Sequence, residues 1–123
     1  MLGSAEIVAF VATTSFDKAR SFYEGVLGLK FVNNDGFALV MEANGVTIRI
    51  AKAGKFMPAQ FTVLGWKVQD IKKTASAMEK KGVKFERFPG MEQDNLGIWT
   101  APGGAKVAWF KDPDGNILSV SEH

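Results

Sequence analysis

The chain has 123 residues, of which 46% are hydrophobic and 23% charged, and its formal net charge is +2. These are the values of an ordinary globular domain with one core. The small charge gives no basis for binding nucleic acid or an anionic membrane, and no apolar run approaches the roughly 18 residues of a membrane span. Cysteine is absent, which excludes disulfides and thiolate metal sites and is typical of a reducing cytoplasm. We therefore expect a cytoplasmic protein with neither a nucleic-acid nor a membrane partner.

The predicted elements occur in the same order in the two halves of the chain. Residues 7–50 read as a strand, a helix and three strands, and residues 61–120 read in the same way. An internal repeat of this size indicates a duplicated structural unit. We predict a single domain with one module at about residues 5–51, a linker at about 52–59 and a second module at about 60–123.

In each half a short apolar strand leads into a helix, predicted at residues 15–27 and 70–81. Ser15 and Asp70 are suited to begin these helices, because their side-chain oxygens can accept a hydrogen bond from a free N–H of the opening turn. A glycine follows the last turn of each helix and suits the left-handed conformation that ends it.

Side chains alternate along the first strands, at 7–12 and 61–68, and so separate two faces. One face is expected to pack on the helix, and the other to line a cleft between the modules. The two halves can be registered on their helix caps and hairpin glycines. This alignment matches Val8 with Val63, Phe10 with Gly65, Ala12 with Lys67 and Arg49 with Ser119, and it places all of them on the cleft face together with Thr47.

Arg49 is the most unusual of these residues, because it lies in the middle of an apolar strand. An unpaired buried guanidinium is costly, so it needs an anionic partner. We predict that Arg49 binds a carboxylate or phosphate of a ligand and that Lys67 adds a second positive charge. The alternative is a salt bridge with Glu42, with Glu86 or with another subunit.

Other chemically suggestive residues have structural interpretations as well. Trp99 and Trp109 belong either to the core or to the wall of the cleft, and we include Trp109 among the candidate ligand contacts. Residues 112–115, Asp-Pro-Asp-Gly, are typical of a tight turn rather than of a catalytic carboxylate pair. The lone histidine, His123, is the last residue and is interpreted as an exposed terminus.

The duplicated βαβββ order and the segments at 21–29 (SFYEGVLGL) and 109–118 (WFKDPDGNIL) resemble the vicinal oxygen chelate superfamily. That superfamily includes glyoxalase I, extradiol dioxygenases and the bleomycin-resistance proteins. The resemblance covers nearly the whole chain. It implies an α+β fold in which two tandem βαβββ modules form a cleft between curved mixed sheets. It implies no single activity, since the fold hosts several chemistries.

The metalloenzymes of this superfamily place His, Gln or Glu at four positions, which are held here by Val8, Arg49, Val63 and Ser119. Aliphatic side chains cannot ligate a metal, arginine has no acceptor lone pair, and a serine hydroxyl is a weak ligand. A divalent catalytic centre needs three or more nitrogen or oxygen donors. The residues therefore predict no metal and no cofactor.

We predict a metal-independent small-molecule-binding protein whose ligand is acidic or acyl-bearing. The alternative is a glyoxalase-like lyase or isomerase that works without the usual metal site. Arg49 and Lys67 would then polarise a carbonyl, and Tyr23, Glu92 or Asp94 would handle a proton. A third interpretation is a structural or protein-interaction module with a filled cleft. No residue is assigned as catalytic.

The first prediction concerns metal content. The purified protein should contain no stoichiometric divalent ion, and adding Zn²⁺, Ni²⁺ or Mn²⁺ should not raise its melting temperature, because no site would bind the native state over the unfolded one. Metal analysis after dialysis and a thermal shift assay measure both. A one-to-one metal content whose removal lowers the melting temperature would contradict this prediction.

The second prediction is a homodimer. Each half-sheet has an open face that another surface has to cover, and a subunit related by two-fold symmetry is the commonest way to cover it. The family resemblance also implies a dimer. Sedimentation equilibrium at micromolar concentration should give twice the 13.4 kDa mass of the chain. A single species of monomer mass would show that the prediction is wrong.

Overall fold

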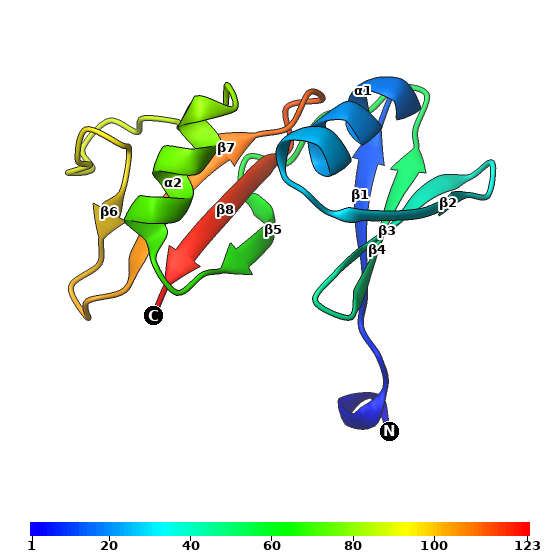
Figure 1. Ribbon diagram of the computed structural model, residues 1–123, viewed down its shortest axis with the longest axis horizontal. Coiled ribbons are helices and arrows are strands. Elements are labelled where there is room, and N and C mark those ends of the chain that lie inside the picture. The colour runs from blue at the N-terminus through cyan, green and yellow to red at the C-terminus, as the bar shows by residue number, and fades with distance from the viewer. The chain divides into compact units, whose positions relative to one another are not determined.

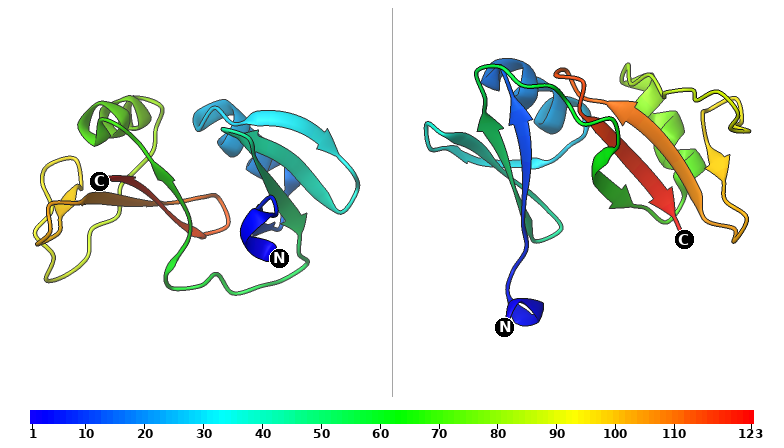
Figure 2. Two further views of the ribbon diagram at one scale, coloured as in Figure 1. Left: turned by 90° about the horizontal axis from the view of Figure 1, so that it is seen from below. Right: turned by 180° about the vertical axis from the view of Figure 1, so that it is seen from behind.

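The computed structural model describes residues 1–123. The chain divides into two compact units, Met1–Met57 and Pro58–His123. Each unit is a four-stranded mixed sheet with helical segments against one face (Figures 1 and 2). None of the helices is long and apolar enough to cross a membrane.

The first unit carries the strand–helix–three-strand order after a short 3-10 helix. Its elements are η1 (Leu2–Ser4), β1 (Val8–Thr13), α1 (Phe16–Arg20), the π-helical η2 (Ser21–Val26), β2 (Lys30–Asn34), β3 (Ala38–Ala43) and β4 (Val46–Lys52). The strands lie in the order β1-β4-β3-β2, with β1 parallel to β4 and the other pairs antiparallel.

The second unit repeats this arrangement. Its elements are β5 (Thr62–Lys67), α2 (Ile71–Lys80), β6 (Trp99–Thr100), β7 (Lys106–Lys111) and β8 (Ile117–Glu122). The strand order is β5-β8-β7-β6, and β5 is the strand that runs parallel to its neighbour. The predicted α+β fold of two tandem βαβββ modules is confirmed.

The predicted helix caps are also confirmed. The Ser15 hydroxyl accepts from the Lys18 N–H at 3.3 Å, and Asp70 Oδ1 accepts from the Lys73 N–H at 3.1 Å. The first helix differs from the prediction, because the α-helix ends at Arg20 and continues as a π-helix. The π-type spacing is seen where the Leu27 N–H donates to the carbonyl of Phe22, five residues earlier.

The core of each unit lies between the sheet and its helix, as the alternation predicted. In the first unit Ile48 and Ile50 of β4 are buried, and in the second Leu118 and Val120 of β8 are buried. Trp66 of the second unit is half-buried and stacks on Phe110 with 6.4 Å between ring centroids.

The second unit departs from an even repeat after α2. Between Lys81 and Ile98 the chain forms isolated bridges but no continuous strand, and β6 has only two residues.

The Asp-Pro-Asp-Gly segment at 112–115 is a turn, as the sequence predicted. The buried Asp112 carboxylate accepts from the backbone N–H groups of Asp114 and Asn116, both at 2.9 Å, and from the Asn116 side chain at 2.8 Å.

Candidate functional site

The candidate residues of the first unit share the face of the sheet opposite α1 and η2. Val8 of β1 lies beside Thr47 of β4, and Phe10 lies beside Arg49. Neighbouring residues on parallel strands project to the same side, so these four form one surface. It is open to solvent at β1, where Phe10 is 63% exposed, whereas Val11 on the helix side is only 4% exposed.

The second unit has an equivalent surface opposite α2. Ser119 of β8 lies between Gly65 of β5 and Trp109 of β7, and Lys67 lies beside Ser121. Lys67 is exposed, Trp109 is half-buried and Ser119 is buried. The predicted pairing of Arg49 with Ser119, and of Phe10 with Gly65, as equivalent positions agrees with the register of both sheets.

The predicted equivalence of Val8 and Val63 is wrong. The register of β5 against β8 shifts between Thr62 and Leu64, so that Val63 lies at a bulge and Thr62 pairs with Ile117. A bulge adds one residue to a strand, and counting back from the helix cap therefore stops one residue short. Thr62 is the residue that occupies the position of Val8.

Arg49 has an anionic partner within its own unit. Its Nη2 donates to Asp35 Oδ2 at 2.8 Å. The other oxygen of Asp35 accepts from the N–H groups of Ala38 at 2.9 Å and Phe37 at 3.0 Å. The Ala38 N–H, the Arg49 guanidinium and the Phe37 N–H together lower the pKa of Asp35 below its usual value. Asp35 is thus an oriented anion on this face.

The salt bridge of Arg49 lies within the chain, but its partner differs from the two that were predicted. Glu42 and Glu86 were the predicted partners within the chain, but Asp35 takes this role, and Glu86 lies 3.7 Å from Lys111 instead. Asp35 escaped the prediction because it lies in the turn between β2 and β3, where strand alternation says nothing about side-chain direction. The one available signal was the Asn-Asp-Gly turn sequence at 34–36.

Trp109 is the centre of an aromatic cluster on the open face of the second sheet. Its Nε1–H donates to the Thr62 hydroxyl at 3.1 Å. The Phe88 ring stands at 88° to it with centroids 5.4 Å apart, and the Trp99 ring lies 6.0 Å away at 37°. The two tryptophans therefore belong to this face and not to the core under α2. Sequence analysis missed Phe88 and Thr62, because neither a loop residue nor a bulge has a periodic signal.

Gly65 allows the Ser119 hydroxyl to lie over the backbone of β5. A Cβ atom at position 65 would be 2.6 Å from Ser119 Oγ. Both residues occupy the middle of the open face, so the hydroxyl is a polar group beside the aromatic cluster.

The residues at the family's metal positions do not fit a divalent centre. Arg49 cannot ligate and already donates to Asp35. Ser119 and Thr62 offer only hydroxyl oxygens, and no three side chains of the types His, Cys, Asp and Glu are grouped so that they could hold a metal ion.

The residues named for proton transfer in the enzymatic alternative are poorly placed for it. Tyr23 is fully buried in the core of the first unit. Asp94 Oδ1 accepts from the N–H groups of Leu96 and Ile98, both at 2.9 Å, within its own loop. Glu92 is exposed on the same loop.

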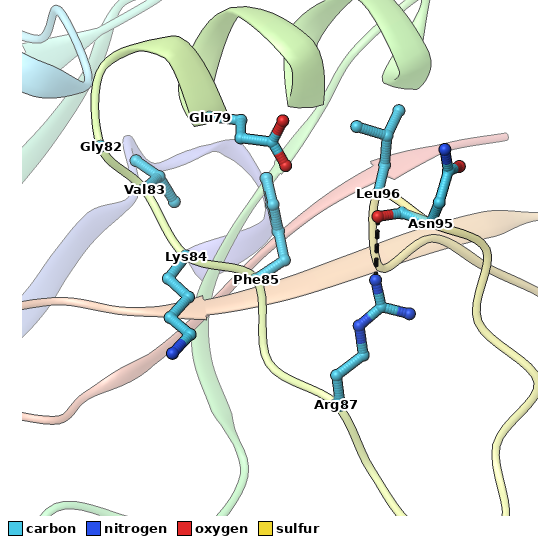
Figure 3. A pocket seen from close by; sticks show the side chains of 8 residues that line it. All are labelled: Glu79, Gly82, Val83, Lys84, Phe85, Arg87, Asn95 and Leu96. Atoms are coloured by element: carbon cyan, nitrogen blue, oxygen red, sulfur yellow. Dashed lines mark hydrogen bonds between the residues drawn. The ribbon is translucent and has the colours of Figure 1, made fainter.

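Two surface cavities lie elsewhere and were not predicted. One, of about 330 Å³, is formed by the last turn of α2 and the loop that follows it (Figure 3). Arg87 at its edge donates from Nη2 to the Asn95 carbonyl at 2.9 Å. The other, of about 370 Å³, lies along α1 and η2 beside the Arg20–Glu24 ion pair. None of the predicted site residues lines either cavity.

Residues 6–120 match the family model of the Glyoxalase/Bleomycin resistance protein/Dioxygenase superfamily. The chain belongs to this superfamily. Its elements and strand order agree with that assignment, and so does the resemblance noted in the sequence.

The chain is also similar to individual proteins, although distantly. Over 58 residues the chain is 36% identical to YraH, an uncharacterized protein of Bacillus subtilis; the match spans 47% of this chain and only 39% of YraH. A superfamily member from Sphaerobacter thermophilus is 19% identical, with a TM-score of 0.77 and full coverage of both chains. Lactoylglutathione lyase from Agrobacterium tumefaciens is 18% identical, with a TM-score of 0.73 over 97% of this chain and 93% of that one. At these identities the two structures show the fold alone.

The close approach of Gly65 and Ser119 yields a third prediction. Gly65→Ala should cost roughly 1 kcal/mol of unfolding free energy, because its Cβ must displace the Ser119 hydroxyl. In a Ser119→Ala background the same change should be neutral or stabilise by up to about 1 kcal/mol, since alanine loses less entropy than glycine in a strand. Urea unfolding of the four proteins completes the cycle. An equal cost in both backgrounds would exclude the contact as its cause.

Proposed function

We propose that this protein binds a small organic molecule, without a metal, on the sheet faces opposite its helices. The observation that carries the proposal is the cluster of Phe88, Trp99 and Trp109 beside Ser119. These aromatic rings are only half-buried, and the indole N–H of Trp109 already has its partner in Thr62. Half-exposed aromatic side chains with a few oriented polar groups are typical of small-molecule sites.

The proposed ligand carries an acidic or acyl group. Arg49 is the residue proposed to recognise that group. A guanidinium has five N–H donors, and the contact with Asp35 uses one of them. Asp35 reduces the positive charge that an incoming anion meets, so we expect a smaller gain than an unpaired arginine would provide. The other proposed ligand contacts are Val8, Phe10, Thr47, Val63 and Lys67. The cleft between the modules, the homodimer and the cytoplasmic location are also proposals.

The enzymatic alternative, a metal-free lyase or isomerase, has less support. Tyr23 is in the core and Asp94 is engaged in its own loop. Binding is therefore the function that the geometry supports best.

The fourth prediction tests recognition of the acidic group. In a thermal shift screen of organic acids, aldehydes and aromatic antibiotics, acidic or acyl-bearing compounds should rank above cationic ones. Arg49→Met should weaken the best acid by roughly 1.5 kcal/mol, the lower end of the range for hydrogen bonds to charged groups. Asp35→Asn should strengthen it, because the guanidinium then keeps its full charge. Isothermal titration calorimetry measures both effects.

The matched control is Arg20→Met. Arg20 is also held by a carboxylate of its own chain, Glu24 at 2.9 Å, but lies on α1. The Arg20→Met substitution should leave the affinity for the best acid unchanged. Cationic compounds at the head of the screen, or an acid that binds Arg49→Met as well as the parent, would show that Arg49 is only a salt-bridge residue.

A further inference from the structure

Phe88 reaches the aromatic cluster from a loop that has almost no strand pairing. Between α2 and β6 the only ladder contacts are the isolated bridges Phe85–Phe110 and Gln93–Trp99. Backbone groups of such a segment need other hydrogen-bond partners. The position of Phe88 against Trp109 therefore depends on the groups that form hydrogen bonds with the backbone of this loop.

Gln93 supplies three of them from one side chain. Its Oε1 accepts from the Phe88 N–H at 2.8 Å, and its Nε2 donates to the carbonyls of Glu86 at 2.8 Å and Gly97 at 2.9 Å. The opposite orientation of the amide would turn its oxygen to two carbonyl oxygens and its NH₂ to an N–H, so the chemistry of the partners fixes this orientation.

Gln93 also pairs with Trp99, the other aromatic residue beside Trp109. The backbone of Gln93 pairs with that of Trp99, whose ring lies 6.0 Å from Trp109. Gln93 thus connects Phe88 through its side chain and Trp99 through its main chain, and the two rings flank Trp109.

Hydrogen bonds and close packing hold the rest of the loop around Gln93. Arg87 donates to the carbonyls of Asp94 and Asn95, as Figure 3 shows for Asn95. At Gly97 a Cβ atom would be 2.8 Å from the Cβ of Phe85, and its φ is +92°, so a larger residue there would be strained and would clash. The loop therefore lies closely against Phe85.

The ring geometry that results favours flat molecules. Phe88 and Trp109 meet at 88°, and two rings at a right angle form a corner in which a planar ligand can stack on one ring while its edge meets the other. A saturated cage of similar size has no flat face to offer. If the loop loosened, the corner would open and this difference would shrink.

We propose that Gln93 is a positioning residue that holds Phe88 and Trp99 around Trp109 and thereby makes this face select planar aromatic carboxylates over bulky saturated ones. The selectivity rests on the proposed binding function; the positioning does not.

The experiment separates these two statements. Gln93→Met keeps the length of the side chain and removes all three hydrogen bonds, whereas Gln93→Glu keeps the acceptor for the Phe88 N–H and removes the donors. The control is Gln69→Met, at an exposed position outside the loop. Near-ultraviolet circular dichroism, which responds to the mutual orientation of tryptophan rings, should change strongly in Gln93→Met, partly in Gln93→Glu and not in the control, while far-ultraviolet spectra stay the same. Unchanged near-ultraviolet spectra in both Gln93 variants would overturn the positioning role.

Selectivity is measured with two probes of equal charge, 1-naphthoate and adamantane-1-carboxylate. The wild type should prefer naphthoate, and Gln93→Met should reduce the ratio of the two affinities by about fivefold, the size expected for an aromatic contact. Phe88→Ala should reduce it similarly, and adding Gln93→Met to Phe88→Ala should change the ratio no further. A ratio that survives in Gln93→Met, or additive losses in the double variant, would overturn the inference. If the wild type binds neither probe, the proposed function fails at this face and the selectivity with it, while the dichroism still decides the positioning role. Should Gln93→Met not fold, Gln93→Glu carries both measurements.

Discussion

A four-stranded sheet with helical cover on one side can bury only one of its two faces, and both units of this protein are built under that constraint. The helix side takes the aliphatic residues of the inner strands, such as Ile50 in β4 and Leu118 in β8, which are fully buried. The opposite side keeps Phe10 exposed in the first unit and the tryptophans half-exposed in the second. Because polar and aromatic groups are left on these open faces, side chains there can vary without a change in the core.

The two open faces are chemically different although the folds beneath them are alike. At equivalent positions the first unit has Arg49 and the second has Ser119. The first face is organised by charge. One oxygen of Asp35 accepts from two backbone N–H groups, and the other accepts from the guanidinium of Arg49. The second is organised by ring packing around Trp109. The two units therefore share one strand order and differ in the side chains on their open faces.

The irregular segments contribute as much to these faces as the strands do. Asp35 comes from a turn, Thr62 from the strand position before a bulge, and Phe88 from a loop. In each case the backbone departs from regular pairing, and a side chain reaches a place that strand alternation would not give it. Such positions can change without disturbing the sheet, which is why function is often found on them.

The sequence by itself determined the duplicated order of elements, the helix caps at Ser15 and Asp70, and the two faces of the inner strands. These features follow from short-range rules, namely side-chain periodicity and the hydrogen bonds of a helix end. Only the tertiary structure decided that Arg49 pairs with Asp35, that Thr62 rather than Val63 stands at the position of Val8, and that Gln93 holds Phe88 against Trp109. Each of these depends on the path of a turn, a bulge or a loop, and side-chain periodicity does not predict the path of such an irregular segment.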